Sequence, residues 1–227
     1  MFSRQTEPAP LLVDSPSATE LADDRQWWRI YEDSIPASER EPRDIILASL
    51  LRDVGKAFRV RAGGSTLGLG TTHLLTDPPA VFLVYLAVDR AQRSRGLGGR
   101  LLEYAWTESA RGLRAQGHDP LGLVWEVDDP AAAEGPQERR VRDRRVHFFT
   151  RHGGAALPWS YRQPPVNGPG PVPMRLMWRP APGQMTPDET GTAALVRAIY
   201  FGKYGAINRI PAAVLQEMLN RSVSSQR

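Results

Sequence analysis

The segment Arg93 to Gly99 brings two arginines and three glycines together in a short polar loop, between an apolar run and a helical pattern. Glycines at the start of a helix leave backbone N–H groups uncovered, and those groups together with the helix dipole attract a phosphate. Arginine side chains add mobile positive charge in the same place, with Arg100 following in the next turn. The loop therefore predicts a phosphate or pyrophosphate site, although a glycine pair before a helix is more often only a tight turn.

Two common phosphate-binding motifs do not fit this loop. A P-loop needs Gly-Lys-Ser/Thr, and the loop holds no lysine. A dinucleotide fingerprint needs glycine directly after the strand, whereas seven residues separate Val88 from Gly96. The segment 93–98, Arg-Ser-Arg-Gly-Leu-Gly, instead resembles the acetyl-CoA-binding motif of the GNAT superfamily of N-acetyltransferases. In that family Gln/Arg-x-x-Gly-x-Gly/Ala follows a hydrophobic strand, and Tyr-Leu-Ala-Val at 85–88 is a typical lead-in.

The resemblance implies that acetyl-CoA is the co-substrate, and it implies how acetyl-CoA binds. The strands expected at 80–88 and 121–127 would splay apart, with the pantetheine arm between them. The backbone at the end of the first strand would bond to the arm, and the loop would hold the pyrophosphate. The implied binding residues are Leu86, Ala87, Val88, Arg93, Ser94, Arg95, Gly96, Leu97, Gly98 and Gly99.

Acetyl transfer to an amine requires a base, because the amine must lose a proton to become nucleophilic. Bacterial protein N-acetyltransferases of this superfamily carry the base in a Leu-Glu-Val strand segment, and Trp125-Glu126-Val127 is similar to it. Glu126 is therefore the candidate base, with a pKa raised by partial burial and acting through a water. The alternative is a strand glutamate that forms a salt bridge with an arginine.

The departing thiolate must gain a proton or leave to solvent, and here the sequence departs from the family pattern. The usual acid is a tyrosine in a Leu-Tyr-Glu-Lys-x-Gly-Phe segment, but Phe149 stands at the matching position and cannot donate a proton. By motif position Tyr161 is the best substitute acid. His147 and His152 are weaker candidates, since each is better explained as a surface histidine.

The elements that must position these residues follow one another in the order of the GNAT fold. Two helices, one carrying Trp27 to Tyr31 and one from about Pro42 to Gly55, precede three strands. A helix over 97–115, a strand, an arginine-rich helix and a closing strand pair come next. The expected strands are 57–60, 65–75, 80–88, 121–127, 156–161 and 173–178. The sequence thus predicts an α/β fold with a mixed, mostly antiparallel central sheet flanked by helices, and a C-terminal helical extension.

The predicted domain boundaries place a flexible lead-in at 1–22, with one short strand near Leu11, the acetyltransferase domain at 23–180 and the helical extension at 181–227. Thr186-Pro187-Asp188-Glu189 fits a capping box that opens the extension, and a second short helix would begin at Pro211. The extension lies outside the family pattern. We expect it to shape one wall of the acceptor site or to make a homodimer contact.

Composition excludes several classes of function. The chain of 227 residues contains no cysteine, which excludes disulfides, thiolate metal sites and an acyl-cysteine intermediate. Its four histidines show no metal-ligand spacing, so no metal is expected. No apolar stretch approaches the roughly 20 residues of a membrane span, and the N-terminus lacks the apolar core of a signal peptide. We expect a cytoplasmic protein without a membrane partner.

The leading hypothesis is an acetyl-CoA-dependent N-acetyltransferase that moves an acetyl group directly to a primary amine of a small molecule or a protein. One alternative, motivated by Phe149, is a CoA-binding regulatory or scaffold module with impaired catalysis. Another is nucleic-acid binding through the segment 137–151, where six arginines face two acids. A solvated helix face explains that charge more simply, so a nucleic-acid partner is not expected.

Overall fold

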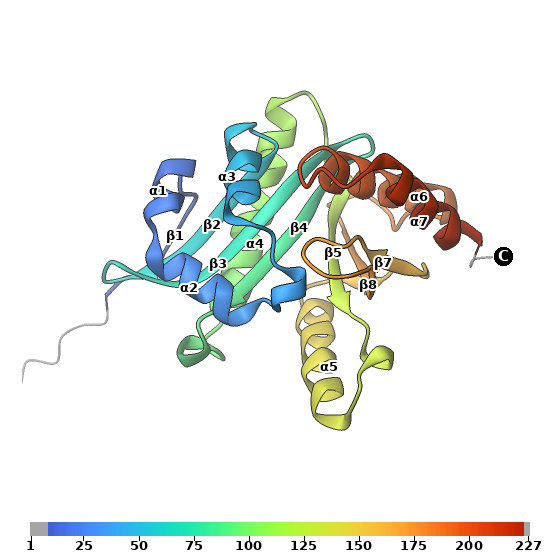
Figure 1. Ribbon diagram of the computed structural model, residues 1–227. Coiled ribbons are helices and arrows are strands. Elements are labelled where there is room, and N and C mark those ends of the chain that lie inside the picture. The colour runs from blue at the N-terminus through green and yellow to red at the C-terminus, as the bar shows by residue number, and fades with distance from the viewer. Residues whose placement is uncertain (1–8, 225–227) are drawn as a thin grey trace, which may run out of the picture.

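A sheet of eight strands runs through the computed structural model, which describes residues 9–224 (Figure 1). Strands β1 to β4 form an antiparallel ladder in chain order, β5 joins β4 in parallel, and β8 continues beside β5. The strands are β1 Leu12–Asp14, β2 Gly55–Ala62, β3 Ser65–Thr76, β4 Pro79–Val88, β5 Gly122–Asp128, β6 Ala155–Ala156, β7 Tyr161–Gln163 and β8 Val172–Pro180. This mixed, mostly antiparallel sheet with flanking helices confirms the expected fold class.

The helices cover both faces of the sheet (Figure 1). The α-helices are α1 Ala18–Asp23, α2 Arg25–Ser34, α3 Arg43–Leu51, α4 Leu97–Ala115, α5 Pro136–Arg151, α6 Glu189–Ala198 and α7 Ala212–Ser224. Three 3₁₀-helices, η1 Ala37–Glu39, η2 Arg90–Gln92 and η3 Pro130–Ala132, and a π-helix, η4 Ile199–Gly205, complete the list. Leu83 and Tyr85 of β4 face opposite sides of the sheet, because the pairing of β4 with β3 shifts by one residue at Val84. Leu83 therefore packs with Leu102 of α4, whereas Tyr85 packs with Trp27 of α2.

The two central strands stop pairing halfway along their length. The parallel register between β4 and β5 ends at Leu83 and Trp125, although β4 continues to Val88 and β5 to Asp128. On its other side β4 stays paired with β3 as far as Val88. Among the described strands, none covers the β5-facing edge of β4 beyond Leu83. The expected splay between these strands is therefore present in the backbone.

Three local expectations were wrong. Residues 18–23, expected in a flexible lead-in, form α1, because Ser17 and Glu20 cap each other reciprocally and Leu21 is buried. Residues 1–8 of that lead-in lie outside the described residues. The expected strand 156–161 is split into β6 and β7 by an irregular segment that contains Pro158. Helix α6 begins at Glu189 with Asp188 as its N-cap, so Thr186 does not cap it.

The C-terminal helices pack into the same core as the sheet. Tyr200 and Tyr204 of η4 are buried in one apolar cluster with Phe82 of β4 and Val124 of β5. The ring centroids of Tyr204 and Phe82 are 6.3 Å apart in an edge-to-face arrangement. A domain boundary at residue 180 remains a prediction, but the packing is continuous across it.

Candidate active site

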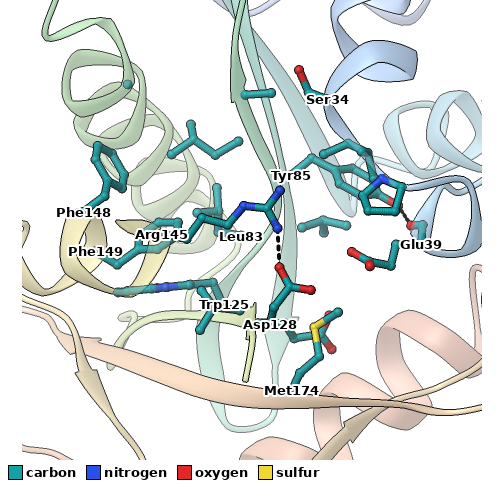
Figure 2. A pocket seen from close by; sticks show the side chains of 18 of the residues that line it. Ser34, Glu39, Leu83, Tyr85, Trp125, Asp128, Arg145, Phe148, Phe149 and Met174 are labelled. Atoms are coloured by element: carbon teal, nitrogen blue, oxygen red, sulfur yellow. Dashed lines mark hydrogen bonds and ion pairs between the residues drawn. The ribbon is translucent and has the colours of Figure 1, made fainter. Parts of the chain in front are cut away.

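A cleft of about 380 Å³ opens where β4 and β5 part (Figure 2). Its walls are the end of β4, the end of β5, the 3₁₀ segment around Glu39 and one side of α5. Figure 2 shows Ser34, Tyr85 and Glu39 on one side, Phe148 and Phe149 on the other, and Trp125 and Asp128 of β5 between them. The cleft thus lies at the edge of β4 that no described strand covers.

The glycine loop forms one end of this cleft. Gly96 has φ +74° and precedes the first residue of α4, and no side chain caps that helix start. Gly98 lines the cleft, where a Cβ atom would lie 3.3 Å from the ring of Phe148. A side chain there would fill space that the glycine leaves open, beside uncapped backbone N–H groups. This cradle fits the phosphates of a nucleotide-like ligand.

The structure divides the ten expected acetyl-CoA residues into two groups. Five line the cleft: Leu86, Ala87, Val88, Arg93 and Gly98. The others do not line it, namely Ser94, Arg95, Gly96, Leu97 and Gly99. Leu97 is buried, and a Cβ on Gly99 would lie 2.6 Å from the ring of His152, so packing explains these two residue types.

Two basic side chains without a carboxylate partner among the described residues line the same cleft. Arg93 and Arg144 both line it and are exposed, and neither has a carboxylate partner within residues 9–224. The Nε of Arg93 donates to the Val88 carbonyl oxygen at 3.3 Å. Two exposed guanidinium groups beside a helix start attract an anion with several phosphate groups.

Glu126 is held by three side chains from distant parts of the chain. The Tyr161 hydroxyl donates to its Oε1 atom, and Gln163 Nε2 donates to Oε2 at 2.7 Å. The Tyr204 hydroxyl lies 3.0 Å from Oε1 and 2.8 Å from Oε2. We call Tyr161, Gln163 and Tyr204 the Glu126 clamp. No arginine pairs with Glu126 among the described residues, which speaks against the salt-bridge interpretation.

Burial and hydrogen bonding oppose each other at Glu126. Burial raises the pKa of its carboxyl to about 7, while the hydroxyls of Tyr161 and Tyr204 and the amide of Gln163 act to lower that pKa. Burial and the Glu126 charge hold the pKa of both tyrosines well above the ordinary range, so both remain donors. A carboxyl that titrates near neutrality at the edge of a cleft suits a general base.

The candidates for the acid lie in different surroundings. Tyr161 is buried, lies outside the lining of the cleft and directs its hydroxyl to Glu126. Phe149 does line the cleft, with its ring centroid 4.8 Å from that of Trp125. His147 is exposed, and His152 packs against Phe148. The geometry therefore brings Tyr161 to the candidate base, and an acid role for it remains a prediction.

Besides Glu126, two further carboxylates line the cleft, Asp128 on the same strand and Glu39 in η1. Asp128 forms an ion pair with Arg145, whereas the carboxylate of Glu39 has no hydrogen bond or ion pair within the described part of the chain (Figure 2). Burial, together with the charges of Asp128 and Glu126, raises the pKa of Glu39 to about 7. No cation among the described residues forms an ion pair with this half-buried carboxylate, although the charges of Arg145 and Arg142 act to lower its pKa.

Sequence reasoning missed Gln163, Tyr204 and Glu39. Gln163 and Tyr204 reach Glu126 from 37 and 78 residues away, distances at which no local pattern relates residues. A signal did exist beside Tyr204: Lys203 continues the apolar stripe of Val196, Ile199 and Tyr200. A lysine on a buried stripe requires a buried acid, and this would have directed attention to η4.

A metal role and a membrane span both lack support in the described residues. Within 9–224, no group of three or more histidine or acidic residues is arranged to hold a metal ion. His73 is buried, and burial together with the Lys203 charge lowers its pKa to about 3. None of the described helices combines the length and apolar character that crossing a membrane requires.

Comparisons with protein families and with solved structures agree with the fold and the cleft described above. The model of the acetyltransferase (GNAT) family matches residues 23–118. Among solved structures, a GNAT-family protein from Bacteroides thetaiotaomicron superposes with a TM-score of 0.65 at 19% identity, covering 86% of this chain and 99% of that one. No curated protein matches the sequence.

Two further solved structures of similar fold are named as acetyltransferases. The ribosomal-protein-S18-alanine N-acetyltransferase from Escherichia coli has a TM-score of 0.50 at 17% identity, covering 79% of this chain and 98% of that one. A GNAT-family acetyltransferase from Elizabethkingia anophelis with acetyl-CoA bound has a TM-score of 0.50 at 12% identity, covering 75% and 98%. At these identities the likeness shows a shared fold, and together with the family match it confirms the resemblance seen in the sequence.

Proposed function

We propose that this chain, which carries the fold and the family match of GNAT acetyltransferases, is an acetyl-CoA-dependent N-acetyltransferase that acts on a primary amine. The observation that carries the proposal is the pairing, in one cleft, of a glycine-and-arginine phosphate cradle with a carboxyl that titrates near neutrality. The phosphate cradle suits a CoA thioester, and the carboxyl suits an amine that must lose a proton. Direct transfer suits a chain without cysteine.

Acetyl-CoA, when bound, would supply the activated acetyl group. The N–H groups at the start of α4 and the guanidinium groups of Arg93 and Arg144 would hold its phosphates. The uncovered edge of β4 from Val84 to Val88 offers backbone donors and acceptors to the pantetheine arm. A solved structure of the same fold with acetyl-CoA bound supports this assignment.

Gly98→Val is expected to weaken acetyl-CoA binding by well over tenfold, about 1.4 kcal/mol or more, while the protein stays folded. The added methyl groups would occupy the space beside the helix start that the phosphates need, next to the ring of Phe148. Calorimetric titration with acetyl-CoA measures the effect. Gly135→Val is the matched control, because a Cβ there meets nothing within 4 Å. Equal affinities in the two folded variants would remove the phosphate role of this loop.

Glu126 would take the proton of the amine, through a water. Tyr161 and Tyr204 of the Glu126 clamp lie outside the lining of the cleft, whereas Gln163 and Glu126 itself line it. The acid that protonates the thiolate remains open, since Phe149 carries no proton to give. Tyr161 and direct protonation by solvent are the two alternatives, and the bond from Tyr161 to Glu126 favours solvent.

The unpartnered carboxylate of Glu39 favours an acceptor that arrives as an ammonium ion. The cation would bind near Glu39 and Asp128 before its proton passes to Glu126. The amine would belong either to a small molecule or to a protein. The proline-rich loop from Arg162 to Pro173 and the helices after Thr186 would shape one wall of the acceptor site or make a homodimer contact, and both roles remain predictions.

Glu39→Gln is expected to raise the KM for a cationic amine about tenfold at pH 8, because one charge-assisted contact is lost. The turnover number should change far less, since Glu39 would bind the ammonium and leave the chemistry to Glu126. Steady-state kinetics with varied amine measure both constants. Glu32→Gln, an exposed glutamate one helix earlier that pairs with Arg43, is the control. An unchanged KM in Glu39→Gln contradicts the acceptor assignment.

A CoA-binding module without catalysis is the second candidate, and Phe149 is the observation that favours it. Thiol release from acetyl-CoA, measured with a panel of primary amines, separates the two. An N-acetyltransferase releases CoA only when an accepted amine is present. A binding module retains its affinity for acetyl-CoA and releases no thiol with any amine.

A further inference from the structure

A π-helix lies where the C-terminal segment meets the sheet. In η4, Ile199–Gly205, the N–H of Ala206 donates to the carbonyl of Phe201, five residues earlier. Runs of this kind are rare and occur often at functional sites. Two consecutive residues of η4, Lys203 and Tyr204, are both about 1% exposed, and both carry polar atoms into the interior. Their hydrogen bonds lead to two different walls of the cleft.

Tyr204 reaches the β5 wall. Its hydroxyl contacts both oxygens of Glu126, and it also accepts a hydrogen bond from Gln163 Nε2 at 3.2 Å. Since Gln163 and Tyr161 bind the same carboxyl, its position is fixed from three directions. Tyr204 itself lies outside the lining of the cleft, so it acts on the acceptor only through Glu126.

Lys203 reaches the opposite wall. Its ammonium donates to the buried carboxylate of Glu41, which also accepts from Asn208 Nδ2 at 2.7 Å. Glu41 belongs to the segment that carries Glu39. Tyr85 binds that segment as well, since its hydroxyl donates to the Glu39 carbonyl at 2.8 Å and accepts from the Glu41 N–H at 3.0 Å.

We propose that η4 completes the active site: Tyr204 is a positioning residue that holds Glu126 in its working geometry and ionisation state, while Lys203 anchors the wall that carries Glu39. This inference rests on the proposed function, because it assigns roles around the same base. It places part of the catalytic machinery in the segment after residue 180, outside the residues that the family model matches.

The test is the pH profile of kcat/KM for Tyr204→Phe, a change that removes one oxygen and keeps the ring against Phe82. The lost hydrogen bond stabilised the ionised carboxylate, so the pKa of Glu126 should rise. We expect the acidic limb to move up by about one pH unit, with roughly tenfold lower activity below the midpoint and wild-type activity well above it. A purely structural role would lower the rate equally at every pH.

Tyr200→Phe is the matched control. Tyr200 lies on the same π-helix and is equally buried, but its hydroxyl donates to the Arg162 carbonyl at 2.7 Å and not to Glu126. Its pH midpoint should equal that of the wild type. Identical midpoints for the two folded variants would overturn the proposal.

A second readout does not depend on activity. Carbon-13 labelling of the glutamate carboxyls, with Glu126→Gln to identify the resonance, reports the ionisation of Glu126 directly. Its midpoint should rise in Tyr204→Phe and stay unchanged in Tyr200→Phe. If the wild type acetylates no amine, the proposed function fails while this titration still decides the role of Tyr204. If the wild type is active and the titration is unmoved, only the role of Tyr204 fails.

Discussion

Glu126→Gln is expected to lower the turnover number by about 10²–10⁴, the usual range for removing a general base. The amide keeps the size of the side chain and can still bond to the tyrosines of the Glu126 clamp, but it cannot accept the proton of an ammonium group. The affinity for acetyl-CoA should stay near that of the wild type, because Glu126 lies on β5 and the phosphate cradle lies at the start of α4. Steady-state kinetics and calorimetry on the same preparation measure the two quantities.

The pKa of Glu126 sets the direction in which the activity should change with pH. Burial raises the pKa of Glu126 to about 7, so the wild-type kcat/KM should rise with pH as the carboxyl loses its proton, with a midpoint near that value. The turnover number of the variant should lack this limb, whereas its kcat/KM should keep the part that the ionisation of Glu39 adds through amine binding. Glu103→Gln, an exposed glutamate that pairs with Arg179, should behave as the wild type. Wild-type turnover with an unaltered profile in Glu126→Gln would return Glu126 to a structural role.

Lys203→Met is expected to destabilise the fold by about 3–5 kcal/mol, since it leaves the buried carboxylate of Glu41 without its cation. Lys203 is 1% exposed and Glu41 is 4% exposed, so water cannot take the place of the ammonium. Asn208 would remain as the donor to Glu41, and a single amide does not balance a charge. Urea unfolding followed by tryptophan fluorescence measures the loss.

Two further variants separate the effect of the lost charge on stability from the effect of the changed packing. The double variant Lys203→Met/Glu41→Gln removes both charges and should recover much of the lost stability. Arg114→Met, which removes an exposed ion pair with Asp119, should leave the unfolding curve unchanged. If Lys203→Met unfolds at the same urea concentration as Arg114→Met, the buried pair contributes nothing of consequence to folding.

The parts of the site that follow from local patterns were predictable. A strand, a glycine loop and a helix start occupy consecutive residues, so spacing predicts a phosphate site there, and the family resemblance assigns Gly98 and Arg93 to it; both line the cleft. Glu126 was assigned by the resemblance of its strand segment, and it lies at the same cleft. The splay of β4 and β5 was implied only by the family resemblance, because pairing between residues 42 positions apart leaves no local pattern.

The Glu126 clamp could not be predicted, for a physical reason. Its members come from β7 and η4, and only the packing of the C-terminal helices on the sheet brings them to Glu126 of β5. The pattern Leu195, Val196, Ile199 and Tyr200 predicts an ordinary amphipathic helix. It does not indicate that the helix widens into a π-helix after Ala198, or that Tyr204 reaches Glu126.

The hydrogen bonds between Tyr204 and Glu126 also bear on the synthesis of the chain. The two residues are 78 positions apart, so the proposed base is made long before its partner leaves the ribosome. A nascent chain that ended near residue 180 would contain the glycine loop and Glu126 but would lack Tyr204 and Lys203. The segment 23–118, which the family model matches, would lack Glu126 as well. The loop proposed to bind acetyl-CoA would be complete on an unfinished polypeptide, whereas the proposed base acquires its environment only when the last helices fold back onto the sheet.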